Sequence, residues 1–363
     1  MANWPSWLPI RDQLRPLTPY GAPQVPADAR LNTNENPYGP SKSLAQAISK
    51  KVAEVAESLN RYPDRDCIKL RSGLKDYLKA QTGIQLQVEN IWVANGSNEI
   101  LQSIFLAFGS AKAVGFVPSY SMHPLIANVA NVDWVDGARN SDFTIDTSNS
   151  IAQILNLKPA LVFITTPNNP TGTSVKIKEI EELANACQKI NALLVVDEAY
   201  AEFSNQPSAI TLIEKYQNVL VSRTMSKAFA FAGVRVGYLA ANKNVIDALQ
   251  LVRLPYHLSA LTQAAAEVAL EFQIELLAEV KRLTVDRDRV SGQLKELGLT
   301  VIPSDANFIL FSGFKMSSHE LWEKLLAEGV LIRDVGLAGY LRVTIGNEAE
   351  NQNFIRALTK VLN

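Results

Sequence analysis

The chain has 363 residues, of which 47% are hydrophobic and 20% charged, so it can bury a sizeable core and is not a disordered protein. Its 35 basic and 36 acidic residues give a net charge of −1, which argues against nucleic-acid binding, because such proteins usually carry a basic patch or stripe. Cys67 and Cys187 indicate no disulfide framework, the three histidines show no metal-ligand spacing, and no apolar run reaches membrane-spanning length. We therefore expect a cytoplasmic protein of about two domains, without a metal centre.

The first 40 residues or so are predicted to be irregular, because five prolines between Pro16 and Pro37 preclude a regular helix. Such an arm must dock on the body of the protein or on a partner subunit. From Ser41 the pattern becomes helical, with apolar residues at spacings of three and four, namely Leu44, Ile48, Val52 and Val55.

The middle of the chain alternates short apolar runs with helical patterns. Strands are predicted at 113–117, 160–165, 193–197 and 218–222, and helices at 98–108 and 177–190. This alternation predicts an α/β fold, a three-layer sandwich with a mostly parallel sheet. Ligands of such sheets bind at the carboxyl ends of the strands.

The pattern changes after about Pro255. A long helical stretch at 259–297 precedes strands at 307–311, 330–334 and 340–346, with helices near 319–328 and at the end of the chain. We expect an N-terminal arm (1–34) that packs with the small domain or a partner subunit, a large domain (35–254) and a smaller α+β domain (255–363).

Lys227 is surrounded by groups that suit an aldehyde carrying a phosphate. Thr224 and Ser226 precede it and Arg235 follows eight residues later. A lysine amine condenses with an aldehyde, while hydroxyls and a guanidinium suit a phosphate monoester. Pyridoxal phosphate (PLP) carries both groups, so the segment predicts a covalent PLP anchor. A lone lysine of this kind would instead be a surface loop residue.

Two strand ends upstream favour the same cofactor. Asp197 ends the apolar run LLVVD, where a carboxylate can keep a pyridine nitrogen protonated, and Tyr200 can donate a hydrogen bond to the ring oxygen. Asn169, in the turn TTPNNPTG, would reach the same ring if its strand lies beside that of Asp197, and Asn169–Pro170 is a candidate cis peptide. In isolation, each of these is also typical of a helix cap or a plain connection.

Other candidates are weaker when taken alone. Ser97 and Asn98 start a helix that can hold a phosphate, although such residues also cap helices routinely. Tyr120 is either a core aromatic residue or a ring-stacking one. Arg333 and Arg342 lie on or beside predicted strands and suit carboxylate or phosphate recognition rather than a surface ion pair.

With these residues in view, the chain resembles the fold type I PLP-dependent aminotransferases, and within them the class II subgroup of histidinol-phosphate aminotransferases. The resemblance covers nearly the whole chain and rests on segments in the family's order, namely LRPLTPY, LNTNENPYGPS, LNRYPD, NGSNEI, TTPNNPTG, VVDEAY, SRTMSKAFAFAGVRVG, IRD and LRVTIG.

The resemblance implies a homodimer with shared active sites and a role for each candidate. Catalysis would fall to Lys227, Asp197 and Tyr200, with Lys227 bound to PLP and then moving the substrate proton. Asn169 and Tyr200 would contact the ring oxygen and Tyr120 would stack on the ring. The cofactor phosphate would be held by Ser97, Asn98, Thr224, Ser226, Arg235 and, from the other subunit, Tyr62. Arg342 would bind the substrate α-carboxylate, and the distal phosphate would meet Arg333, Tyr20 and Asn36.

The implied reaction is a transamination in histidine biosynthesis, from histidinol phosphate and 2-oxoglutarate to imidazole-acetol phosphate and glutamate. Aromatic amino-acid transamination and threonine-phosphate decarboxylation on the same scaffold stay open. A PLP-binding regulator without activity would need a DNA-binding appendage, which the irregular N-terminal residues do not provide. No nucleic acid or membrane is expected as a partner.

Overall fold

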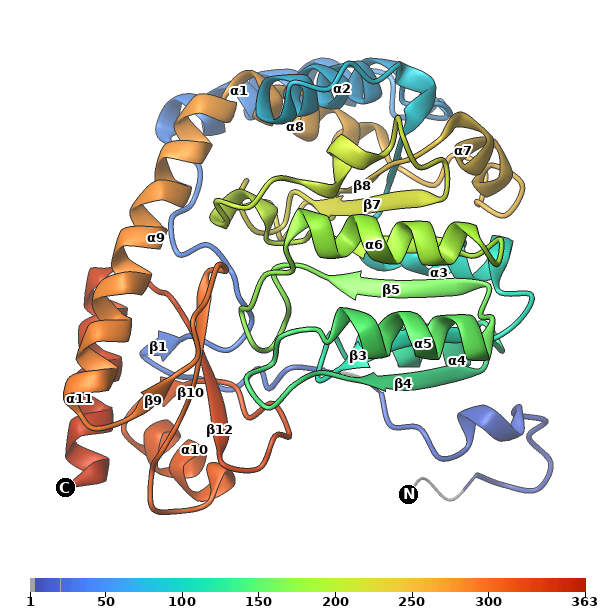
Figure 1. Ribbon diagram of the computed structural model, residues 1–363. Coiled ribbons are helices and arrows are strands. Elements are labelled where there is room, and N and C mark those ends of the chain that lie inside the picture. The colour runs from blue at the N-terminus through green and yellow to red at the C-terminus, as the bar shows by residue number, and fades with distance from the viewer. Residues whose placement is uncertain (1–3, 20) are drawn as a thin grey trace.

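A seven-stranded sheet forms the centre of the larger part of the computed structural model, which describes residues 4–19 and 21–363 (Figure 1). Its strand order is β2-β8-β7-β6-β5-β3-β4, and β8 runs in the direction opposite to the other six strands. The strands span Ile91–Ala94 (β2), Ala113–Val117 (β3), Trp134–Ala138 (β4), Leu161–Thr165 (β5), Leu193–Asp197 (β6), Val219–Thr224 (β7) and Gly237–Ala240 (β8). The four predicted strands are β3, β5, β6 and β7.

Helices cover both faces of this sheet. Figure 1 shows α5 (Thr147–Leu157) and α6 (Ile177–Gln188) on the near face, and α3 (Ser97–Phe108) and α4 (Met122–Val129) behind it. Alternate residues of a strand therefore enter different cores: Val162 and Ile164 of β5 join one cluster, and Phe163 joins the other. This two-sided burial explains the unbroken apolar runs and confirms the predicted three-layer sandwich.

The long helical stretch predicted at 259–297 is two helices rather than one. α8 (Ala260–Glu271) ends at Phe272, whose φ of −100° and ψ of 16° leave helical geometry, and α9 (Gln273–Glu296) follows at once. The break lets α8 pack against α1 (Lys42–Ala56) and α2 (Ile68–Thr82), while α9 continues to the smaller part (Figure 1). A short helix, α7 (Lys243–Leu249), packs near α3.

The smaller part is an antiparallel sheet of β9 (Thr300–Val301), β10 (Phe308–Ser312) and β12 (Tyr340–Thr344), with helices α10 (Ser318–Ala327) and α11 (Glu348–Leu362). The strand predicted at 330–334 is shorter: β11 (Val330–Leu331) lies outside this three-stranded sheet, and Arg333 forms an isolated bridge to Arg342 of β12. The N-terminal segment contributes β1 (Ala29–Arg30), which pairs with β11 in parallel.

The arm before β1 lies on the larger part. Its described residues include one turn of 3-10 helix at Asp12–Leu14, and the Arg11 guanidinium donates a hydrogen bond of 2.7 Å to the Val129 carbonyl at the end of α4. The arm therefore contacts the large sheet's helices before its end joins the small part.

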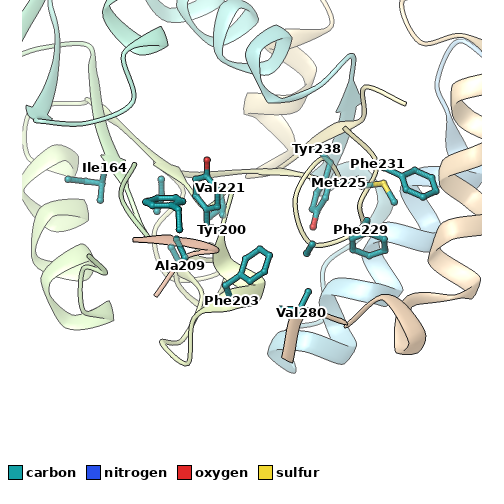
Figure 2. Packing of buried hydrophobic residues seen from close by; sticks show 14 of the residues in the cluster. Ile164, Tyr200, Phe203, Ala209, Val221, Met225, Phe229, Phe231, Tyr238 and Val280 are labelled. Atoms are coloured by element: carbon teal, nitrogen blue, oxygen red, sulfur yellow. The ribbon is translucent and has the colours of Figure 1, made fainter. Parts of the chain in front are cut away.

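The apolar core extends to the end of the sheet at which the central strands β6 and β7 terminate. Figure 2 shows Tyr200 and Val221 in one part of this cluster, and Met225, Phe229 and Tyr238 in another. The ring of Tyr200 also meets Phe308 of the small part edge-on, with ring centroids 5.1 Å apart. Within the described residues, no helix combines the length and apolarity needed to cross a membrane.

Candidate active site

A cavity of about 320 Å³ opens at the carboxyl ends of the parallel strands, where the small part meets the large sheet. Twelve of the predicted site residues line it, although they come from segments up to 245 positions apart. They are Ser97, Asn98, Tyr120, Asn169, Asp197, Tyr200, Thr224, Ser226, Lys227, Arg235, Arg333 and Arg342.

Two predicted residues, Tyr62 and Asn36, do not line this cavity. Tyr62 is 79% exposed and stacks on Tyr256, with ring centroids 4.3 Å apart. Asn36 borders a neighbouring cavity, where its side-chain oxygen accepts the Tyr38 N–H at 3.0 Å. Tyr20 lies outside the described residues.

Lys227 follows β7 and is held as a reactive amine. Its Nζ donates a hydrogen bond of 2.9 Å to the Thr33 carbonyl. Burial, and to a smaller extent the positive charge of Arg342, lower the pKa of Lys227 to about 8. Because only the neutral amine attacks an aldehyde, this environment favours covalent attachment near neutral pH.

Asp197 ends β6 with one carboxylate oxygen free to meet a ligand. Its Oδ2 lies 3.2 Å from His123 Nε2, whereas Oδ1 is buried and has no hydrogen-bond partner among the described residues. A buried carboxylate oxygen of this kind requires a donor, and the protonated pyridine nitrogen of PLP is one. The register pairs Asp197 with Thr165 of β5, which brings Asn169 to the same end of the sheet.

His123 is a site residue that the sequence interpretation missed. It lies on α4 and is buried, and it packs edge-on against Tyr120 with ring centroids 5.4 Å apart. Its contact with Asp197 fixes the orientation of that carboxylate. The sequence offered one signal for His123: it lies three residues, or about one helical turn, after Tyr120, which itself follows the strand predicted at 113–117.

The first turn of α3 and the loop after β7 form a cradle for a phosphate. The Arg235 guanidinium donates to Ser226 Oγ at 3.4 Å and passes over Gly96, the residue before the helix. A Cβ at Gly96 would lie 2.5 Å from this guanidinium, and its φ of +79° also favours glycine. Free N–H groups at a helix start bind anions, so the cradle fits the PLP phosphate.

Two arginines of the small part face the rest of the cavity. Arg342 is buried; its guanidinium donates to the Asn169 side-chain oxygen and, at 2.8 Å, to the Asn32 carbonyl. Arg333 is half-buried, and its guanidinium makes no hydrogen bond or ion pair with the described part of the chain. The cavity therefore offers two cationic groups beyond those that fit PLP.

The ring-contacting candidates are held by their own partners. The Tyr200 hydroxyl accepts a hydrogen bond of 2.9 Å from Asn34, and the Tyr120 hydroxyl donates to Asn98 Oδ1 at 3.2 Å. The peptide bond of Asn169–Pro170 is cis, as the sequence predicted.

A buried ion-pair cluster lies next to the site. Two of its members are sequence neighbours of residues near strand ends: Glu198 follows Asp197, and Arg223 follows Ser222 in β7. The Arg223 guanidinium bonds to Glu198 at 2.8 Å and to Glu202 at 3.3 Å, and the Tyr77 hydroxyl donates to Glu202 at 3.1 Å. Two carboxylates share one cation here, and burial raises the pKa of Glu202.

Comparison with known proteins identifies the family. The family model for aminotransferase class I and II matches residues 28–358. A histidinol-phosphate aminotransferase of Mycolicibacterium smegmatis is 54% identical over 353 residues, which cover 96% of this chain and 92% of that protein.

Solved structures agree with this result. The histidinol-phosphate aminotransferase from Clostridium acetobutylicum superposes with a TM-score of 0.83 at 26% identity, over 92% of this chain and 99% of that one. The enzyme of that name from Sinorhizobium meliloti, in complex with pyridoxal-5'-phosphate, has a TM-score of 0.81 at 25% identity, over 93% of this chain and 91% of that one. The predicted fold and cofactor are confirmed: the protein is a PLP-dependent enzyme. The chain belongs to the aminotransferase class I and II family.

Proposed function

We propose that this protein transfers an amino group from histidinol phosphate to 2-oxoglutarate, giving imidazole-acetol phosphate and glutamate, a step of histidine biosynthesis. The observation that carries the proposal is the pair of guanidinium groups, Arg333 and Arg342, that face the cavity in addition to the groups that fit PLP. Substrates of this reaction carry a phosphate or two carboxylates, and arginine binds both anions with the same planar fork. The name of the relative from Mycolicibacterium smegmatis supports the same substrate.

Each cavity residue has a proposed task. PLP, when bound, supplies the electron sink for a carbanion. Lys227 anchors PLP and then, as a neutral amine, moves the proton of the substrate carbon. Asp197 keeps the pyridine nitrogen protonated, and Asn169 and Tyr200 contact the ring oxygen. Tyr120 covers the ring face.

The remaining residues bind anions. The PLP phosphate is assigned to the α3 cradle, formed by Ser97, Asn98, Thr224, Ser226 and Arg235. Arg342 takes the α-carboxylate of glutamate. Arg333, together with Asn36 and Tyr20, takes the distal phosphate or carboxylate.

We also propose a homodimer in which Tyr62 reaches the PLP phosphate of the other subunit. The support is a group of exposed apolar side chains close in sequence to Tyr256, which stacks on Tyr62: Leu251 is 85% and Leu254 72% exposed. Apolar patches of this kind mark interfaces. Sedimentation at micromolar concentration tests the dimer, and loss of PLP affinity in Tyr62→Phe tests the shared site.

The division into an arm (1–34), a large domain (35–254) and a small domain (255–363) stays a prediction. The cytoplasm stays the proposed location, because both cysteines are free and buried, which suits a reducing compartment.

A half-reaction screen tests the function. The PLP enzyme is mixed in turn with histidinol phosphate, glutamate, phenylalanine and threonine phosphate, and the absorbance of the cofactor and any carbon dioxide are followed. The proposal expects rapid bleaching with histidinol phosphate and glutamate, without carbon dioxide. Faster bleaching with phenylalanine, or carbon dioxide from threonine phosphate, would contradict it.

Arg333→Ala separates substrate binding from cofactor binding. The KM for histidinol phosphate should rise by about tenfold or more, because a charge-assisted contact to phosphate is lost, while PLP affinity stays unchanged. Arg356→Ala, which removes an exposed arginine of α11, is the matched control.

A further inference from the structure

We propose that Asn34 is a positioning residue: it orients the Tyr200 hydroxyl toward the ring oxygen of PLP and couples that hydroxyl to the strand that carries Arg342. The inference deepens the proposed function and rests on its placement of Tyr200 at the ring oxygen.

Three consecutive residues of the N-terminal segment each hold one functional group of the site. The Asn32 carbonyl accepts from Arg342 at 2.8 Å, the Thr33 carbonyl accepts from Lys227 at 2.9 Å, and the Asn34 side chain donates to Tyr200 at 2.9 Å. Only the third of these contacts is made by a side chain. It is therefore the one that a substitution changes without moving the backbone.

Every polar group of Asn34 is used. Its N–H donates to Thr344 Oγ1 at 3.0 Å, its Oδ1 accepts from that hydroxyl at 2.9 Å, and its carbonyl accepts from Asn307 at 3.2 Å. Only 2% of Asn34 is exposed, and its φ of 55° lies in the left-handed region that asparagine tolerates better than most residues. The side chain is thus locked between Tyr200 and the end of β12.

This network decides which way the Tyr200 proton points. Thr344 Oγ1 accepts the Asn34 N–H and gives its own proton to Asn34 Oδ1, so the other arm of the amide is the NH2 group. An NH2 group only donates, and Tyr200 must therefore accept from it. The proton of Tyr200 therefore points away from Asn34, and Tyr200 lines the cavity assigned to PLP.

A hydrogen bond from Tyr200 has a measurable effect on bound PLP. With PLP bound through Lys227, an anionic ring oxygen would help to hold the proton on the linking nitrogen of Lys227. Donation from Tyr200 disperses that negative charge, so the linking nitrogen loses its proton at lower pH. Loss of the donation should raise the pH midpoint of the PLP absorbance change.

The test is an absorbance-monitored pH titration of the holoenzyme in a double-mutant cycle. Tyr200→Phe removes the donor, and Asn34→Asp places an acceptor where Tyr200 now finds an NH2 group, drawing the Tyr200 proton away from PLP. We expect each single variant to raise the midpoint by about one pH unit, the size of one hydrogen bond to a charged group. With Phe at position 200, Asn34→Asp should raise it by less than half as much, through its charge alone.

Equal shifts from Asn34→Asp with and without the Tyr200 hydroxyl would overturn the inference and leave the proposed function intact. A midpoint unchanged by Tyr200→Phe would overturn the inference and the proposed contact of Tyr200 with the ring oxygen, whereas the amino transfer itself would still be decided by the half-reaction screen.

Thr344 provides a second route that does not depend on the stability of the Asn34 variant. Thr344→Val removes the hydroxyl that locks the amide and should raise the midpoint in the same direction, whereas Thr344→Ser keeps the hydroxyl and should restore the wild-type value. A Thr344→Val enzyme that titrates like wild type would contradict the coupling to β12.

Discussion

The reactivity of Lys227 before PLP binds is a direct consequence of its burial. The usual lysine pKa of 10.5 falls to about 8 in this site. At pH 8 about half of the Lys227 amines are neutral, against about 0.3% for an ordinary lysine, so the reactive fraction is about 150-fold larger. The rate at which the apoenzyme forms its covalent link with PLP should therefore rise with pH, with a midpoint near 8, and then level off.

The assay is stopped-flow absorbance after mixing apoenzyme with PLP across a pH series, with a simple alkyl amine to correct for the ionisation of PLP itself. Two charge changes serve as opposite controls. Arg342→Gln removes a positive neighbour and should move the midpoint up, whereas Glu35→Gln removes a negative one and should move it down. A midpoint near 10.5, or shifts of the same sign in both variants, would refute this account of Lys227.

Three further changes test the surroundings of the site. Gly96→Ala puts a Cβ 2.5 Å from the Arg235 guanidinium at a positive φ, so PLP affinity by equilibrium dialysis should fall by about tenfold or more; wild-type affinity would contradict the phosphate cradle. His123→Phe keeps the packing but frees Asp197, so PLP should dissociate faster in a dilution assay, whereas an unchanged rate would exclude the positioning role of His123. Glu202 has a raised pKa, so folding favours its protonated form and wild-type stability should fall as pH rises above the usual value of 4.5; Glu202→Gln should flatten this slope in urea unfolding, and an unchanged slope would contradict it.

The parallel core was predictable because its signals are local. The four residues before Asp197, at 193–196, are all apolar, which is typical of a strand buried on both faces, and Asp197 stands at the strand end where such sheets bind ligands. β2 and β8 were not predicted, because each is four residues long and the antiparallel pairing of β8 depends on partners distant in sequence.

The site was less predictable where long-range packing decides the geometry. The segment LNTNENP offers three asparagines, and its pattern alone does not distinguish them. Asn36 is predicted at the site from the family resemblance, and the structure in addition turns Asn34 toward Tyr200, because the backbone of Asn34 is left-handed and Thr344 from β12 holds its side chain. His123 was missed for a similar reason: its contact with Asp197 requires α4 to pack behind the sheet.

The most direct test of the central claim follows the amino group itself. The PLP enzyme is given one equivalent of histidinol phosphate labelled with nitrogen-15 on its amine, and 2-oxoglutarate is added afterwards. We predict that the label first stays with the protein fraction, about one per active site, and then appears in glutamate. Label released as ammonia, or retained in unreacted histidinol phosphate while another amine is consumed, would contradict the proposal that this cavity transfers the amino group of histidinol phosphate.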